Sequence, residues 1–159
     1  MIGGWAAYLW TNLHKSKDVD IVVKGFDGLA ALKRKFNLKK NDELRKYEIK
    51  MDEIDIDVYV PFFSRLAMPA EDIPEHVAAI QGFEAAKPEA LLILKQGAEQ
   101  DREHSVKGEK DRIDIVALLL YSELNIREYL RLLKKYKLEH FFTRLKSIIS
   151  GFREIKYKS

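Results

Sequence analysis

The sequence predicts an α/β (α+β) fold: a small mixed β-sheet with flanking helices, followed by a C-terminal helical bundle. Two observations favour this fold class. Strand-like and helix-like runs alternate over residues 1–85, whereas residues 86–159 are almost entirely helix-like. Alternation is typical of helices packed on a sheet, and a run of helices is typical of a bundle packed beside it. We expect these two regions to form one compact unit.

Composition limits the class of protein. The chain has 159 residues, enough for one sizeable core. It has no cysteine, which excludes disulfide frameworks and thiolate metal sites and favours a reducing compartment. No run approaches the roughly 18 apolar residues of a membrane span, and no signal-peptide pattern opens the chain. We therefore expect a cytoplasmic protein that does not act at a membrane.

The first elements are expected as helix, strand and helix. Residues 4–13 are apolar on every side of a helix, which predicts a largely buried helix. The run DVDIVVKG, 18–25, predicts a strand. A helix over about 28–37 follows, with Asp27 as its N-cap. The polar residues 39–43 are expected to form a loop.

A hairpin and a proline-rich loop complete the first region. The runs at 45–51 and 53–60 predict two strands that turn at Asp52 and Glu53. Pro61, Pro69 and Pro74 mark a loop over about 61–75, and one short strand is expected near 77–83.

The second region predicts four helices. The first covers about 88–103, with Pro88 in its first turn. A polar break at 105–110 precedes a helix over about 111–122. Asn125 and Glu128 predict a capping box for the helix over about 127–136. The last helix, 138–150, is expected to stop at Gly151.

The stretch around which the chain is organised joins two glycines to two acids. Gly3 and Gly4 open the first helix, and Asp18 and Asp20 stand two apart on the following strand. Residues two apart share a strand face and lie roughly 6.5 Å apart. Acids are rarely buried unless they are paired or bind metal. A helix N-terminus binds anions, and Mg²⁺ prefers carboxylate oxygens. The pattern predicts a site for a metal ion and a phosphate group; the alternative is a solvent-facing strand.

A third carboxylate is expected on the strand EIDIDVYV. Two-metal phosphoryl chemistry needs carboxylates that bridge ions about 4 Å apart. Asp55 and Asp57 both lie on one face of this strand, and Ile54, Ile56 and Val58 lie on the other. Either acid could serve, and both could instead be solvent-facing residues.

Charged residues of the second region form another candidate group. Lys95 and Arg102 are seven residues apart and share a helix face. Lys110, Asp111 and Asp114 follow, and the two acids share a face at a helix start. Lys95 could neutralise phosphate charge in a transition state. Alternatively, Lys95 is a surface lysine and the aspartates only cap the helix.

These motifs resemble those of the DNA polymerase β-like nucleotidyltransferase superfamily, in which a Gly-Gly or Gly-Ser pair and a helix precede a D-x-D strand. The resemblance implies that 1–85 is a nucleotidyltransferase catalytic core and 86–159 a helical region packed on it. It implies that Asp18, Asp20 and Asp57 bind Mg²⁺ or Mn²⁺ and are catalytic. Asp57 is favoured over Asp55 because it leads into the apolar VYV run. Trp5 stands where the superfamily often has Ser or Thr, which leaves phosphate contacts to backbone amides.

The order of Lys95, Arg102 and Lys110-Asp111-Arg112-Ile113-Asp114 is similar to that in AbiEii-type nucleotidyltransferases, toxins of toxin–antitoxin pairs. The gap between Arg102 and Lys110 is longer than expected for AbiEii proteins, which indicates a sister family. The resemblance implies an NTP substrate bound by Gly3, Gly4, Lys95, Lys110 and Asp111, with Lys95 also catalytic. It further implies an RNA 3′ end, such as that of tRNA, or a protein hydroxyl as acceptor, and an antitoxin protein as partner.

The C-terminal third is strongly basic. Over 131–158, nine lysines and arginines stand against Glu139 and Glu154: Arg131, Lys134, Lys135, Lys137, Arg144, Lys146, Arg153, Lys156 and Lys158. Such a stretch is either an electrostatic footprint for RNA or a solvated helical face.

Other catalytic classes have no support. The histidines His14, His76, His104 and His140 lack metal-ligand spacing, and no serine has a nucleophile-elbow context. We expect an Mg-dependent nucleotidyltransferase, and the alternative is a non-catalytic nucleotide- or partner-binding relative of the same fold.

Overall fold

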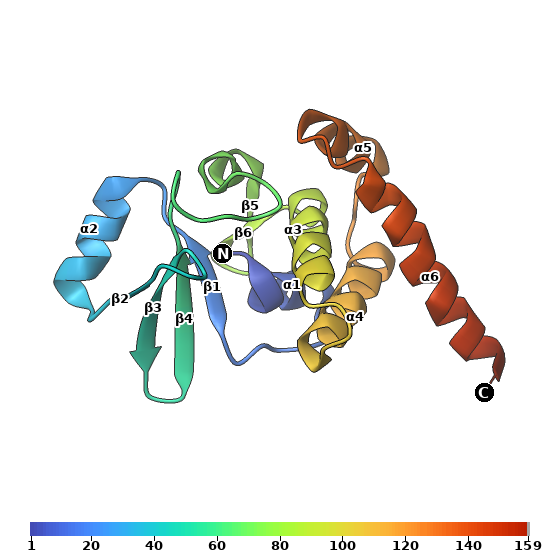
Figure 1. Cartoon of the computed structure of the whole chain (residues 1–159), viewed down its shortest axis with the longest axis horizontal. Coiled ribbons are helices and arrows are strands. Elements are labelled where there is room, and N and C mark those ends of the chain that lie inside the picture. Colours follow the sequence, from blue (N-terminus) through green and yellow to red (C-terminus); the bar gives the residue numbers. More distant parts are fainter. Residues whose placement is uncertain (159) are drawn as a thin grey trace.

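A small mixed sheet and a group of helices lie side by side in the computed structural model, which describes residues 1–158 and side chains as far as Glu154 (Figure 1). The mixed helix-and-sheet class expected from the sequence is confirmed. The helices are α1 (Gly3–Thr11), α2 (Phe26–Lys35), the 3₁₀ helix η1 (Ala70–His76), α3 (Pro88–Asp101), α4 (Val106–Tyr121), α5 (Ile126–Lys135) and α6 (His140–Lys158). The strands are β1 (Val19–Val22), β2 (Lys39–Asn41), β3 (Lys46–Met51), β4 (Ile54–Tyr59), β5 (Val77–Ile80) and β6 (Phe83–Ala86).

The four-stranded sheet has one apolar and one charged face. Its strand order is β1-β4-β3-β2, and β1 is parallel to β4 while the other pairs are antiparallel. Alternate residues such as Ile49 and Val58 are buried with Leu29 of α2, so α2 covers the apolar face. The other positions carry acids and lysines. The expected hairpin is confirmed, with Met51 opposite Ile54 across the turn.

The first two residues connect the two sheets. The Ile2 amide donates to the Asp20 carbonyl at 2.9 Å, and the Ala86 amide donates to the Met1 carbonyl at 2.9 Å. This segment fixes the start of α1 against β1. Helix α1 itself is buried through Ala6, Ala7 and Leu9, as its all-round apolar sequence predicted.

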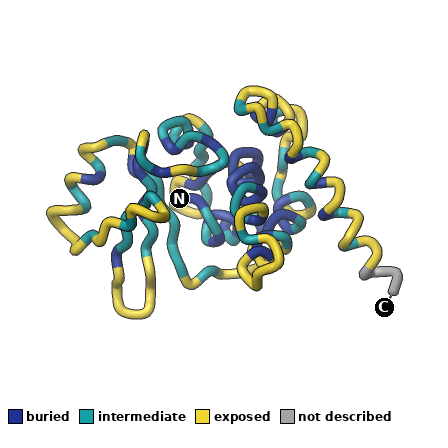
Figure 2. The backbone as a smooth tube through the Cα atoms, viewed as in Figure 1, coloured by how far each residue is buried: buried dark blue, intermediate teal, exposed yellow. Residues whose placement is uncertain are grey.

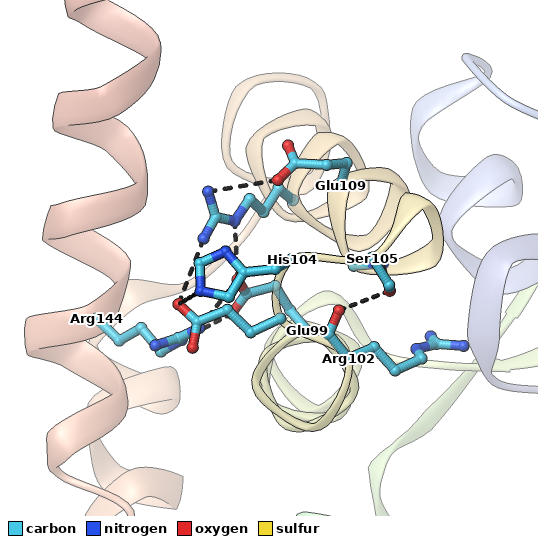
Figure 3. A network of polar contacts seen from close by, with 9 residues as sticks. Glu99, Arg102, His104, Ser105, Glu109 and Arg144 are labelled. Carbon is cyan, nitrogen blue, oxygen red and sulfur yellow. Dashed lines mark hydrogen bonds and ion pairs between the residues drawn. The ribbon is translucent and has the colours of Figure 1, made fainter.

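Buried polar side chains fasten the helices of the second region together. Gln96 of α3 donates to the Phe141 carbonyl at 2.8 Å and accepts from the Tyr129 hydroxyl at 2.6 Å. The fully buried Glu99 accepts from Arg112 of α4 at 2.8 Å and from Arg144 of α6 at 2.7 Å (Figure 3). Helix α3 is therefore the central element, and Figure 2 shows it buried along most of its length while α6 is largely exposed.

One expectation for a short stretch was wrong and another was incomplete, because strand pairing is decided by tertiary contacts as well as by local preference. The segment expected as a loop at 39–43 contains strand β2, which pairs with β3 and is held by the Asn41 amide donating to Glu48 at 3.0 Å. The short strand expected near 77–83 is present as β5, but it is one half of a hairpin with β6 that turns at Gln81 and Gly82, both with positive φ.

Three helix boundaries also differ from those expected. Helix α4 begins at Val106 rather than near 111, because the Ser105 hydroxyl caps it by accepting from the Gly108 amide at 3.0 Å. Helix α2 begins at Phe26, so Asp27 is not its N-cap. Helix α6 runs through Gly151 to Lys158. A glycine inside a helix costs only about 1 kcal/mol relative to alanine, so Gly151 does not have to end it.

The Asn125 cap is confirmed with a changed partner. Its side chain accepts from the amides of Arg127 and Glu128. The Asn125 backbone amide, which a capping box would bond to Glu128, donates instead to the carboxylate of Glu89 of α3 at 2.6 Å. Glu128 instead pairs with Arg131. Helix α5 is thus tied to the start of α3.

Candidate functional site

Asp20 and Asp57 are neighbours on the charged face of the sheet. The two residues are direct partners in the register of the parallel strands β1 and β4. Both side chains are partly buried, and that of Asp57 is 19% exposed. Side chains at partnered positions of adjacent strands share a face. The structure therefore brings together two of the three predicted metal ligands.

Each of these two carboxylates accepts one hydrogen bond from a side chain on the same face of the sheet. The Tyr59 hydroxyl donates to Asp20 Oδ1 at 3.3 Å, and Lys46 Nζ donates to Asp57 Oδ2 at 2.6 Å. Sequence reasoning missed both donors. A signal was present, because a two-residue turn between Met51 and Ile54 fixes the register of the hairpin and places Glu48 opposite Asp57, which puts Lys46, two residues before Glu48, on the face of Asp57.

The pair is electrostatically costly. Burial, followed by the negative charge of Asp57, raises the pKa of Asp20 to about 6, and the positive charge of Lys95 acts in the opposite direction. Burial and the charges of Asp20 and Asp57 raise the pKa of Tyr59, which is thus a neutral donor. A cation beside two carboxylates would relieve this repulsion. The donor set therefore fits a hard divalent ion that prefers oxygen ligands.

The glycine pair lets α1 approach this carboxylate. Gly3 has a φ of 72°, and a Cβ atom at this position would lie 2.0 Å from Asp20 Oδ2. At Gly4, a Cβ atom would lie 2.8 Å from the Cβ of Ser16. No side chain caps the first turn of α1. The free amides of that turn and the Asp20 carboxylate consequently meet at one place, where an anion and a cation can bind together.

The remaining strand acids lie apart from this pair. Asp18 directly precedes β1, and Asp55 is exposed on β4, opposite Lys50. The structure thus puts Asp57 rather than Asp55 beside Asp20. Among the residues whose side chains are described, no three histidine, cysteine, aspartate or glutamate side chains gather closely enough to hold a metal ion. Asp18 is accordingly not brought into a three-carboxylate cluster.

The charged residues of the second region form a buried ion cluster between α3 and α4. Lys95 Nζ lies 3.2 Å from Asp111 Oδ1 and 2.7 Å from Asp114 Oδ2. Arg102 Nη2 lies 2.5 Å from Asp111 Oδ2, and the Arg102 side chain is 41% exposed. Lys110 is exposed on α4 and joins no ion pair among the described side chains. The structure thus gathers four of the five residues singled out in this region.

This ion cluster acts on the sheet carboxylates. The charge of Lys95 offsets part of the rise in the pKa of Asp20, and that of Arg102 offsets part of the rise in the pKa of Tyr59. Helices α3 and α4, which carry the cluster, both pack against α1 (Figure 1), the helix whose first turn meets Asp20.

An open hollow of about 550 Å³ adjoins the start of β1. Its lining consists of Trp5 of α1, Ser16 and Lys17 before β1, Val19 of β1, and Glu53 and Ile54 at the start of β4. Asp18 stands between two of these lining residues. The hollow is large enough for a nucleotide-sized ligand.

No family model matches the sequence, and no curated protein matches it significantly. Among solved structures, the chain is similar to the crystal structure of an antigenic nucleotidyltransferase-like protein from Paracoccidioides brasiliensis. The TM-score is 0.46 and the sequence identity 18%, over 91% of this chain and 82% of that chain. A similarity this distant assigns no activity. Within the part of the chain that the structure describes, no helix is both long and apolar enough to span a bilayer.

Proposed function

We propose that this protein is a metal-dependent nucleotidyltransferase, which moves a nucleoside monophosphate from an NTP to an acceptor hydroxyl. The observation that carries the proposal is the pairing of Asp20 with Asp57 in register, with Gly3 of α1 directly against Asp20. Two carboxylates and the first turn of a helix at one place suit a phosphate chain that arrives with a divalent cation.

The residues divide the work by their charge. Asp20 and Asp57 would hold Mg²⁺ or Mn²⁺, which when bound polarises the phosphoryl oxygens. The amides at Gly3 and Gly4 bind phosphate oxygens. Asp57 accepts the proton of the acceptor hydroxyl as its oxygen attacks the α-phosphorus in line. The bond from the α-phosphorus to the bridging oxygen breaks, and pyrophosphate leaves.

The buried ion cluster between α3 and α4 supports this reaction through its positive charges. Lys95 is held by Asp111 and Asp114, so its ammonium is fixed in position rather than free to move. Its charge reaches Asp20. We assign to Lys95 and to the half-exposed Arg102 the stabilisation of negative charge on the departing pyrophosphate. Lys110, exposed on the same helix as Asp111, is a candidate contact for the nucleotide.

The acceptor belongs to the proposal as well. Exposed lysines of α5 and α6, including Lys134, Lys135 and Lys146, suit the phosphates of an RNA acceptor such as tRNA. Arg131 and Arg144 are already paired with Glu128 and Glu99. Lys156 and Lys158 lie outside the side chains that the structure describes. A toxin role of the AbiEii type, with an antitoxin partner, is the cellular setting that we propose.

A second candidate is a nucleotide-binding relative without transfer activity. It is favoured by one observation: no cluster of three metal-binding side chains forms among those described. Such a protein would bind the NTP and would release no pyrophosphate.

The two candidates are separated by a transfer assay. Each of the four α-³²P-labelled NTPs is incubated with Mg²⁺, total tRNA and either the wild type or Asp20→Asn. We expect label to reach RNA or the protein itself in the wild type and to be lost in the variant. NTP binding without transfer, at any metal concentration, would establish the binding module instead.

A further inference from the structure

Lys46 places a cation directly on the proposed metal site. Its ammonium lies 2.6 Å from Asp57 Oδ2 and 3.7 Å from Glu48 Oε1, and its side chain is only 14% exposed. Glu48 is the register partner of Asp57 on β3. Lys46 therefore lies between two acids of one cross-strand row, on the side of Asp57 away from Asp20.

The contact of Lys46 with Asp57 differs in charge from the contact of Tyr59 with Asp20. Tyr59 gives Asp20 a neutral hydrogen bond, whereas Lys46 gives Asp57 a full positive charge. Lysine is rarely so buried unless it is paired. An ammonium and a divalent ion repel each other, and Lys46 already occupies Oδ2 of this carboxylate. Asp57 cannot keep this contact and also bind a metal ion with full affinity.

We propose that Lys46 is a tethered counter-ion that occupies Asp57 in the ligand-free protein and keeps its affinity for divalent ions low. The proposal rests on the proposed function. Glu48 gives the displaced ammonium a second acid to pair with, since it is already 3.7 Å away. A metal ion that arrives with a nucleotide brings phosphate charge that offsets the repulsion from Lys46. Metal binding is thereby coupled to nucleotide binding.

The test measures metal affinity without nucleotide, by the electron paramagnetic resonance signal of free Mn²⁺. The wild type is compared with Lys46→Met and with Lys50→Met as matched control. Lys50 lies on the same strand and the same face, opposite Asp55, and is exposed. We expect Lys46→Met to bind Mn²⁺ more tightly by about ten-fold or more, and Lys50→Met to resemble the wild type.

Two further variants fix the interpretation. Lys46→Arg keeps the charge and should keep the weak affinity of the wild type. The double variant with Lys46→Met and Asp57→Asn should lose the gain. If Lys46→Met, checked as folded by circular dichroism, binds Mn²⁺ no more tightly than Lys50→Met does, or if Lys46→Arg binds it as tightly as Lys46→Met does, the inference is wrong.

Failure of the inference can be told apart from failure of the proposed function. The same titration is repeated with a non-hydrolysable NTP analogue. If no variant binds Mn²⁺ with or without the analogue, the metal-dependent function is overturned as well. If the wild type binds Mn²⁺ with the analogue and transfers label, yet Lys46→Met and Lys50→Met behave alike, only the role of Lys46 is lost.

Discussion

At Asp20, burial and a neighbouring negative charge act in the same direction, and both disfavour the ionised carboxylate. The residue therefore costs folding energy at neutral pH. An uncharged side chain at this position would not incur this cost. A carboxylate whose pKa is strongly raised in this way is typical of a functional site. The close approach of Gly3 has the same meaning, because any other residue there would collide with this carboxylate.

Asp20→Asn should stabilise the ligand-free protein at neutral pH. The pKa of Asp20 rises from 3.8 in the unfolded chain to about 6 in the folded protein. The protonated carboxyl therefore adds to the free energy of unfolding fully below pH 3.8, and this stabilisation is lost as the pH rises through 6. The rise corresponds to about 3 kcal/mol. Chemical unfolding should show the variant more stable at pH 7.5 and much less so at pH 4. An equal difference at both values would show that the Asp20 charge is not the cause.

Gly3→Ala should destabilise the protein by about 1–3 kcal/mol, because the positive φ and the collision with Asp20 both oppose a Cβ atom. The matched control is Gly151→Ala, where a Cβ atom meets open space within α6. That change should be neutral or stabilising by up to about 1 kcal/mol. The free energy of unfolding of both variants is measured by urea denaturation. Equal stability of the two would remove the argument for close packing at Gly3.

At the scale of the element, polar contacts between helices decide the arrangement of the second region. Ser105 starts α4 early and Glu89 completes the cap of α5. Glu99 holds α4 and α6 to α3 through two arginines. These contacts also explain why Arg144, in the basic stretch 131–158, is structural.

Glu99→Gln should destabilise the protein by about 2 kcal/mol, since it leaves Arg112 and Arg144 without their shared charge partner. Burial alone would raise the pKa of Glu99, but hydrogen bonds from Arg144 and Arg112 lower it below 4.5. Its stabilisation is therefore present above pH 4.5 and lost as the pH falls through the folded value. Thermal unfolding between pH 3 and pH 7 should show a flatter profile for the variant.

The control for this prediction is Glu109→Gln. Glu109 lies 3.6 Å from Arg112, but its side chain is 61% exposed. Exposed pairs contribute little, so the change should stay within about 0.5 kcal/mol. A loss as large as that of Glu99→Gln would contradict the distinction between the two pairs.

At the scale of the whole molecule, one core joins the two halves of the chain. Ile2 and Ala6 pack in the same cluster as Leu91, Ile115 and Leu132. Helix α1 lies between the sheet and α3 and α4 (Figure 1). Helix α1 consequently joins the strand that carries Asp20 to the two helices, α3 and α4, that hold the ion cluster around Lys95.

Periodicity in the sequence was enough to predict the hairpin and the buried α1, and the resemblance to nucleotidyltransferases added that Asp20 and a carboxylate of EIDIDVYV share a site. It did not decide between Asp55 and Asp57, because both share a face and only the register of β1 against β4 separates them. It also missed Lys46 and Tyr59, whose contacts depend on cross-strand neighbours rather than on local sequence. Strand β2 was missed because its polar residues are stabilised only by pairing with β3.

The most direct test of the central claim compares Asp57→Asn with Asp55→Asn in the Mg²⁺-dependent transfer of α-³²P-labelled nucleotide. The two aspartates lie on the same strand and the same face, but only Asp57 is the register partner of Asp20. We predict that Asp57→Asn lowers transfer by about 100-fold or more, while Asp55→Asn retains the activity of the wild type. Equal activity of the two variants, or a larger loss in Asp55→Asn, would contradict the assignment of the site.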